Sequence, residues 1–330
     1  MIGYYVHHQG RGHWNRAASI CARLREPVTV LTSLRVERSD VFAHVVTLPL
    51  EDLGHDAPDP TAGGALHWAP LHDNGLRTRM HRITEWIEAA RPSAMVVDVS
   101  VEVATLCRLL GVPVVVVAMP GERTDFAHDL VYRLADHVVA AWPGELCEPT
   151  WLRGHRHKTT YVGGISRFDG RSAASAPHPG RPKILVVGGA GGSSVDADDV
   201  AECARSLPQF DWTAIGVAGS PWVEDPWAAM CSADVIVAHA GQSSIADIAA
   251  ARRPAIILPE PRPFDEQCAT ADALARAGLA VTHPGWPDTA RWPDLIECAL
   301  RLDVDRWDQW RTEGSATRAA DAVHSVSEGT

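Results

Sequence analysis

The sequence lacks the features that would place the protein in a membrane or on nucleic acid. Its longest apolar run, around Leu109 to Met119, is interrupted by Gly111 and Pro113 and is too short to span a bilayer. Basic residues number 30 against 41 acidic ones, and the formal charge of −11 argues against non-specific binding of nucleic acid or anionic lipid. Any anionic ligand must therefore be held by local groups, such as helix ends and a few arginines.

The sequence also contains neither a Cys-x-x-Cys pair nor the pattern of a signal peptide in its first residues. The seven cysteines include no Cys-x-x-Cys pair, and their odd number favours reduced thiols over a disulfide framework. The first residues, Met1–Val6, have the pattern of a strand rather than of a signal peptide. We therefore expect a cytoplasmic protein without an integral membrane segment.

What the sequence does contain is two series of short apolar runs, each followed by a polar loop and a segment of helical periodicity. Runs that are apolar on both faces and alternate with helices are typical of buried strands in a parallel sheet. The predicted strands are Ile2–Val6, Val28–Thr32, Ala94–Val97 and Pro113–Ala118 in the first series, and Lys183–Val187, Asp211–Val217, Asp234–Ala238 and Ala255–Leu258 in the second.

The two series are separated by residues 171–182 (RSAASAPHPGRP), which have the composition of a linker. We therefore predict two doubly wound, Rossmann-like α/β domains, over residues 1–170 and 183–330. The second domain is expected to end in one or two closing helices within Val304–Val326. A long irregular stretch, Glu51–Asn74, is expected to be functional, because loops of this length inside compact domains seldom lack a role.

The first candidate site follows the first strand, since ligands of open parallel sheets bind beyond the carboxyl ends of the strands. Gly10 and Gly12 let the backbone turn tightly and approach a ligand, and His13 then lies at the start of a helix. His13 is either a general base or a residue that caps the turn. Asp98 follows another buried strand and either orients the His13 ring or caps the next helix.

The second candidate site follows the strand that ends at Ala238. A helix that opens here offers free backbone N–H groups and hydroxyls to a diphosphate. The residues concerned are His239, Gly241, Gln242, Ser243 and Ser244. An N-cap serine is the simpler explanation, but it leaves His239 and Gly241 unexplained. Asp247 falls one turn inside the helix, where its carboxylate is expected to accept hydrogen bonds from ribose hydroxyls.

Two further loops and one aromatic residue are weaker candidates for the same ligand. Gly189 and Gly191 lie in a glycine-rich loop that lacks both the Gly-x-Gly-x-x-Gly spacing and the lysine of a P-loop, yet would let a phosphate approach the backbone. Glu266 and Gln267 follow a strand end and are expected to pair with sugar hydroxyls, unless they are merely polar surface residues. Trp222 either stacks on a nucleotide base or is an ordinary core or surface tryptophan.

The acidic string Asp196–Asp199 imitates a metal clamp, but it falls in the first turn of a predicted helix, where acidic residues complement the macrodipole. No cysteine–histidine cluster has the spacing of a zinc site. We therefore expect neither a metal nor a cofactor.

Several of these motifs resemble nucleotide-sugar glycosyltransferases of the GT-B fold. His239-x-Gly241-x-x-Ser244-x-x-Asp247 is similar to the phosphate and ribose signature of UDP-glycosyltransferases, and Glu266-Gln267 resembles their pair that contacts donor sugar hydroxyls. Gly10-x-Gly12-His13-x-x-Arg16 resembles their amino-terminal loop, with its candidate catalytic histidine, and Asp98 stands where plant-type members pair an aspartate with it. Much of the chain is also similar to glycosyltransferase family 28, to which the enzymes that form lipid II belong.

This resemblance implies two Rossmann-like domains that face a cleft, with the acceptor on the amino-terminal domain and the donor on the carboxyl-terminal one. It implies an inverting, metal-independent transferase that moves a sugar from a nucleoside diphosphate, with UDP favoured, to a hydroxyl acceptor. A lipid-linked acceptor would bring peripheral contact with a membrane. A nucleotide-sugar hydrolase, a non-hydrolysing epimerase and a non-catalytic nucleotide-sugar-binding subunit remain alternatives.

Overall fold

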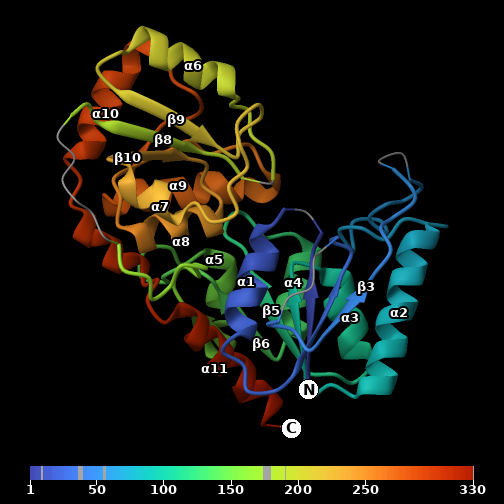
Figure 1. Cartoon of the computed structure of the whole chain (residues 1–330). Helices are drawn as coiled ribbons and strands as arrows, with labels where there is room; N and C mark the ends of the chain where they lie inside the picture. Colours follow the sequence, from blue (N-terminus) through green and yellow to red (C-terminus); the bar gives the residue numbers. More distant parts are fainter. Residues whose placement is uncertain (9, 36–39, 55–56, 174–179, 190, 330) are drawn as a thin grey trace.

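The computed structural model of the protein describes residues 1–8, 10–35, 40–54, 57–173, 180–189 and 191–329, which form two α/β domains (Figure 1). The amino-terminal sheet has the strand order β3-β2-β1-β4-β5-β6-β7 and the carboxyl-terminal sheet the order β12-β11-β10-β8-β9. Neighbouring strands are parallel in both sheets. The predicted fold class, two doubly wound α/β domains, is confirmed.

The strands are β1 (Ile2–Val6), β2 (Val28–Thr32), β3 (His44–Thr47), β4 (Ala94–Asp98), β5 (Val114–Ala118), β6 (His137–Ala140), β7 (Thr159–Tyr161), β8 (Lys183–Val187), β9 (Asp211–Ile215), β10 (Val235–Ala238), β11 (Ala255–Ile257) and β12 (Val281–Thr282). The α-helices are α1 (Gly12–Cys21), α2 (Asn74–Ala90), α3 (Val101–Leu109), α4 (Phe126–Leu134), α5 (Thr150–Arg153), α6 (Ala197–Ser206), α7 (Trp227–Ser232), α8 (Gln242–Ala251), α9 (Glu266–Ala277), α10 (Trp292–Leu300) and α11 (Ser315–Ser327). None of the helices in the described ranges is both long and apolar enough to span a bilayer.

Strand register brings the predicted site loops together. In the amino-terminal sheet Val6, the last residue of β1, lies opposite Thr32 on one side and Asp98 on the other. The loops that follow β1 and β4 therefore emerge side by side. In the carboxyl-terminal sheet Ala238, which ends β10, lies opposite Val187 and Ile257, so the loops after β8, β10 and β11 also share one edge.

The strands that were not predicted are the short or exposed ones, namely β3, β6, β7 and β12. Three of the four β3 residues are exposed, and β12 is only two residues long, so neither carries the run of buried apolar residues that marks the central strands. Only part of the expected linker, residues 171–182, can be compared, because residues 174–179 lie outside the described residues.

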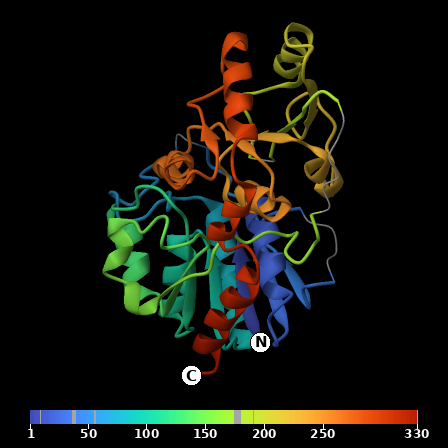
Figure 2. The same cartoon turned by 90° about the vertical axis from the view of Figure 1, so that its left-hand side faces the viewer.

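The carboxyl-terminal helix α11 corrects the predicted domain boundary. Residues 304–326 were expected to close the second domain, and a 3₁₀ helix (Val304–Trp310) does precede α11. However, α11 packs against α1 and the amino-terminal sheet, where Ala319 and Val323 join the cluster of Ile2 and Tyr4. In Figure 2 this helix, in red, runs down the lower domain toward the C-terminus. The small alanine side chains let it lie close to the sheet.

The acidic string at the start of α6 caps its helix. The Asp196 side chain accepts from the backbone N–H groups of Asp198 and Asp199, while the Asp199 side chain accepts from the Asp196 N–H. This is the reciprocal capping box expected at a helix start. The string is thus used locally, as its position in the first helical turn predicted.

Trp292 gives a test of the core of the carboxyl-terminal domain. It is fully buried and its ring lies 5.1 Å from that of Trp212 and 4.7 Å from that of Trp286. We expect Trp292→Ala to lower the free energy of unfolding by about 3–5 kcal/mol, because the cavity adds to the lost burial. Leu300→Ala, on the same helix but exposed, should cost less than about 1 kcal/mol. Equal losses in urea unfolding would contradict this packing.

Candidate active site

The loop after β1 and the end of β4 bring His13 and Asp98 into contact. Gly10 turns the loop with a φ of 78°, and His13 follows as the second residue of α1. Its Nδ1 lies 2.9 Å from Oδ1 of Asp98, whose side chain is fully buried. Asp98 does not cap α3, because Ser100 fills that position and accepts from the N–H of Val103. The structure therefore pairs the two predicted catalytic residues.

Arg16 completes this group from one helical turn further along α1. Its Nε donates to Oδ2 of Asp98 at 3.0 Å and its NH2 to Oδ1 at 2.6 Å. Burial alone would raise the pKa of Asp98, but the charges of Arg16 and His13 and their hydrogen bonds hold it well below its usual range. An ionised Asp98 accepts a hydrogen bond from His13 Nδ1, which leaves Nε2 as the ring nitrogen that could accept a proton.

Backbone strain lies beside the same carboxylate. Val99, which follows Asp98, has a φ of 72°, a left-handed conformation that is rare for a β-branched residue. Strain of this kind persists only where the surroundings hold it, and it is concentrated at functional sites. Here it separates Asp98, buried under α1, from Ser100, which begins the next helix.

The start of α8 contacts the start of α1 where the two domains meet. Gly241 is the N-cap of α8 and makes no side-chain cap, so neither Ser243 nor Ser244 is used as a simple N-cap. The Ser243 hydroxyl donates to the Gly12 carbonyl at 3.3 Å, and Gln242 Oε1 accepts from Arg16 at 2.7 Å. Figure 1 shows α8 at the lower edge of the carboxyl-terminal domain, above and to the left of α1. The free N–H groups and positive dipole end of α8 are thus directed at the predicted base.

His239 is oriented by a backbone carbonyl. Its Nδ1 donates to the Leu258 oxygen at 2.8 Å, and its Nε2 lies 2.8 Å from the Ser193 hydroxyl. Glu260 Oε1 lies 3.4 Å from the same Nε2 and accepts from the Ser194 N–H at 2.7 Å. Burial raises the pKa of Glu260, but the Ser194 hydrogen bonds and the charge of His239 lower it overall.

Three of the residues predicted to bind the nucleotide sugar are hydrogen-bonded or ion-paired to other protein residues. Gln267 Oε1 accepts from the N–H groups of Ala240 and Glu260 at 3.1 and 2.9 Å, and so ties the loop after β10 to the loop after β11. Glu266 is paired with Arg123 of the amino-terminal domain at 3.1 Å. Asp247 is buried and accepts from Ser166 at 2.6 Å and Arg167 at 3.3 Å. Contact of these side chains with sugar or ribose hydroxyls stays a prediction.

The glycine-rich loop and Trp222 lie on the surface of the carboxyl-terminal domain. Trp222 is 52% exposed, with the Arg11 guanidinium 5.9 Å from its ring. Gly189 and Gly191 are exposed, and the Gly191 carbonyl accepts from Arg262 at 2.7 Å. Both features are therefore exposed to solvent, and their contact with a ligand stays a prediction.

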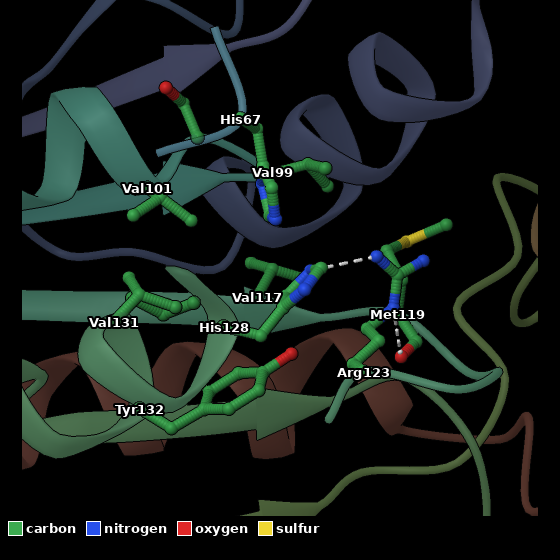
Figure 3. Close-up of a pocket in the computed structure, with 11 residues that line it drawn as sticks. His67, Val99, Val101, Val117, Met119, Arg123, His128, Val131 and Tyr132 are labelled. Carbon is green, nitrogen blue, oxygen red and sulfur yellow. Dashed lines mark hydrogen bonds between the residues drawn. The ribbon is translucent and has the colours of Figure 1, made fainter. Parts of the chain in front are cut away.

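A second polar group lies in the amino-terminal domain (Figure 3). Asp125 accepts from His67 Nε2 at 2.9 Å and from His128 Nδ1 at 2.5 Å, while Arg123 donates to His128 Nε2 at 3.0 Å. The ring nitrogens of His67 and His128, Met119, Arg123 and Tyr132 border a cavity of about 30 Å³, lined otherwise by valines and Ser100. That volume holds one or two water molecules.

His67, Asp125 and His128 are close enough together to hold a metal ion, and they are the one such trio among the described residues. Burial lowers the pKa of His128 to about 4, so its ring is neutral and carries one proton. An ion on Nδ1 would force that proton onto Nε2, against the Arg123 guanidinium. The donors and acceptors therefore fit a hydrogen-bonded array better than a cation.

Sequence reasoning missed several residues that these contacts single out, namely Arg16, Arg123, Ser193 and Glu260. Arg16 lies three residues after His13, and helical spacing puts the two on one face. Glu260 lies two residues beyond the buried run that ends at Leu258, so the strand-end rule that selected Asp98 also applies to it.

Comparison with known proteins agrees with this architecture. Residues 184–285 match the sequence model of the glycosyltransferase family 28 C-terminal domain. A UDP-N-acetylglucosamine–N-acetylmuramyl-(pentapeptide) pyrophosphoryl-undecaprenol N-acetylglucosamine transferase of Sorangium cellulosum is 28% identical over 205 residues, which are 54% of this chain and 49% of that protein. The protein of the same name from Paracidovorax citrulli is 31% identical over 170 residues, 44% and 46% of the two chains. The matched region thus spans about half the length of these relatives.

Solved structures cover nearly the whole chain. The glycotransferase of kitacinnamycin superposes with a TM-score of 0.70 at 16% identity, over 98% of both chains. MurG of Acinetobacter baumannii gives a TM-score of 0.63 at 16% identity, over 98% of this chain and 100% of that one. A UDP-glucosyltransferase of Polygonum tinctorium gives 0.67 at 15% identity, over 100% and 99%.

The protein therefore has the GT-B fold of these structures. Within it, residues 184–285 are similar to the family 28 C-terminal domain and to the N-acetylglucosamine transferases named above. The predicted resemblance to the GT-B and family 28 proteins is confirmed.

Asp247 gives a pH-dependent test of the domain interface. Burial raises its pKa to about 6, against the lowering effect of Ser166 and Arg167. Between about pH 4 and pH 6 the folded protein holds a proton that the unfolded chain has lost, so wild-type stability falls as pH rises through this window. The asparagine of Asp247→Asn does not titrate, so the variant does not lose this stability. Its free energy of unfolding relative to wild type should therefore rise by on the order of 3 kcal/mol between pH 4 and pH 7.

Urea unfolding of both proteins from pH 4 to pH 7 measures this difference. Asp272→Asn, which changes an exposed carboxylate on α9, serves as the matched control and should show no such trend. An Asp247→Asn offset that stays constant across the range would contradict the raised pKa.

Proposed function

We propose that the protein is an inverting, metal-independent glycosyltransferase that uses a nucleoside-diphosphate sugar. The observation that carries this proposal is the meeting of a His13–Asp98 pair with the open N-terminus of α8, one on each side of the cleft. The first arrangement suits removal of a proton from a hydroxyl, and the second suits a dianionic leaving group. The fold and the family 28 type of the carboxyl-terminal domain support it.

His13 is the proposed general base. As the acceptor oxygen attacks the anomeric carbon, the acceptor O–H bond breaks and Nε2 takes the proton. The bond between the anomeric carbon and the diphosphate oxygen breaks with its electron pair going to the diphosphate. Asp98 accepts from Nδ1 at 2.9 Å and stabilises the imidazolium that forms. Attack from the face opposite the leaving group inverts the anomeric centre.

The departing diphosphate is the proposed ligand of the α8 N-terminus. Free N–H groups of the first turn and the hydroxyls of Ser243 and Ser244 supply hydrogen bonds, and the helix dipole supplies positive potential. Ser193, held by His239 at 2.8 Å, adds a hydroxyl from the glycine-rich loop. Preorganised donors of this kind stabilise developing charge without a cation. The protein's formal charge of −11 makes such local groups necessary.

The donor is proposed to be UDP-linked, and the acceptor is a hydroxyl compound bound by the amino-terminal domain. The relatives and neighbours whose names include UDP support the first part. The second rests on the position of His13 and of residues 51–54 and 57–74 on that domain. Two of these, His67 and Trp68, are anchored by their backbone N–H groups to Glu102 at 2.8 and 3.0 Å.

His13→Ala tests the assignment of the base. We expect turnover to fall by roughly a hundred- to ten-thousand-fold, which is the usual value of general-base assistance, while nucleoside-diphosphate binding stays nearly intact. Steady-state kinetics and calorimetry measure the two quantities. His81→Ala, an exposed histidine of α2, is the control and should keep wild-type turnover. Wild-type turnover in His13→Ala would refute the role, and sugar release without any acceptor would identify a hydrolase.

Chelation tests the proposed metal independence. Transfer measured after dialysis against EDTA should stay within about twofold of transfer with added Mg²⁺ or Mn²⁺, since no step of the proposal needs a cation. Loss of transfer on chelation, restored by a divalent ion, would contradict it. The His67→Ala variant would then show whether the histidine–aspartate trio holds that ion.

A further inference from the structure

We propose that Arg16 is a positioning residue that joins the base to the donor site. Its guanidinium pairs with Asp98 behind His13 and at the same time reaches Gln242, the first residue of α8. One side chain thereby aligns the proton acceptor in one domain with the diphosphate helix in the other. This inference rests on the proposed function and adds to it a residue for which the sequence patterns assigned no role.

The contacts of Arg16 use most of its donors. Nε and NH2 hold the two oxygens of Asp98 at 3.0 and 2.6 Å, and NH1 donates to Gln242 Oε1 at 2.7 Å. The side chain is only 4% exposed. NH2 also lies 2.9 Å from His13 Nδ1, because both groups donate to the same oxygen of Asp98. A planar, five-donor group is required to make these contacts together, and lysine offers only a single nitrogen.

Charge explains why His13 is free to act as a base. Asp98 is fully buried, and a buried carboxylate needs a cation beside it. Arg16 supplies that cation permanently, so the Asp98 charge does not need a second cation on His13. Without Arg16, the His13 imidazolium would become the nearest counter-ion of Asp98, and protonation of His13 would be favoured.

The other titratable groups around His13 leave this balance in place. On β1 and the loop after it, the ring of His7 lies 6.1 Å from that of His13, and burial lowers the pKa of His7 to about 3, so it is neutral. His8 stacks on His7. The charges of Glu51 and Arg79 pair with each other at 2.6 Å, and those of Glu266 and Arg123 at 3.1 Å. From β1, Tyr4 faces Asp98 and Arg16, and burial raises its pKa.

The pH profile of transfer tests the charge argument. In Arg16→Gln the acidic limb of kcat/KM should move to higher pH by about one unit or more, and activity should return as pH rises. In Arg16→Lys, which keeps the charge, the limb should stay near its wild-type position. The control Arg318→Gln, an arginine that bonds the Val162 and Arg311 carbonyls outside the site, should leave the limb unmoved. A uniformly lower profile with an unmoved limb in Arg16→Gln overturns the proposal.

A double-mutant cycle tests the link to α8. Arg16→Lys and Gln242→Leu should each lower kcat/KM for the donor by about tenfold, the usual effect of losing a hydrogen bond to a charged group. The double variant should be no worse than the poorer single variant, because both remove the same contact. If the kcat/KM losses of the two single variants multiply in the double variant, the proposed link between Arg16 and Gln242 is overturned. This cycle decides the matter even if the Arg16→Gln chain does not fold.

The outcomes separate this inference from the proposed function. If the wild-type protein transfers sugar, but the acidic limb of Arg16→Gln does not move and the losses in the double-mutant cycle multiply, only the role of Arg16 is overturned. Absence of wild-type transfer with any nucleotide sugar overturns the proposed function. In that case NMR still tests Arg16, because the chemical shifts of the His13 ring protons report the pH at which the ring becomes protonated. A higher midpoint pH in Arg16→Gln than in wild type supports the proposal, and an equal midpoint overturns it.

Discussion

The buried carboxylate of Asp98 is the constraint on which the rest of the site depends. A charge without solvent at the end of β4 is tolerated only with cations and hydrogen-bond donors around it, and His13 and Arg16 provide them. The contacts of His13 and Arg16 with Asp98 hold the start of α1 against the end of β4. Because Arg16 also holds Gln242, the same need fixes the start of α8 relative to α1. A local electrostatic requirement in one domain therefore helps to set how α1 and α8 lie against each other.

The two domains meet through polar contacts at helix starts and through a continuous apolar cluster. Arg16 reaches the first residue of α8, and Arg123 reaches Glu266, the first residue of α9. Behind them, the apolar cluster that contains Val97 of the amino-terminal sheet also contains Ile236 and Ile245 of the carboxyl-terminal domain. The apolar contact buries surface of both domains, while the arginine contacts align the starts of α8 and α9 with the amino-terminal domain.

The sequence predicted most of the central strands, and it placed His13 and Asp98 at neighbouring strand ends with pairing as one of two alternatives for Asp98, because parallel sheets impose such patterns. Strands β1, β2 and β8 have the predicted bounds, since each is a run of apolar residues closed by polar ones. Strand β3 is exposed and β12 very short, so neither left such a pattern. The destination of α11 was not predictable either, because an alanine-rich face does not say which sheet it covers.

Within the site, residue type and position were predictable but hydrogen-bond partners were not. Asp247, Glu266 and Gln267 lie at the expected strand and helix ends, yet each is engaged by a residue distant in the sequence. Arg16 was visible only as a spacing, since its role depends on a strand 82 residues away and a helix 226 residues away. Such contacts arise from tertiary packing, which local patterns do not encode.

The most direct test of the account is a crystal structure with uridine diphosphate bound in the presence of EDTA. The account predicts that phosphate oxygens accept hydrogen bonds from the first turn of α8 and from the Ser243 and Ser244 hydroxyls, with no cation between protein and phosphate. It also predicts that His13 Nε2 faces the side on which the sugar would lie. A diphosphate bound away from α8, or one bridged to acidic side chains by a metal ion, would contradict it.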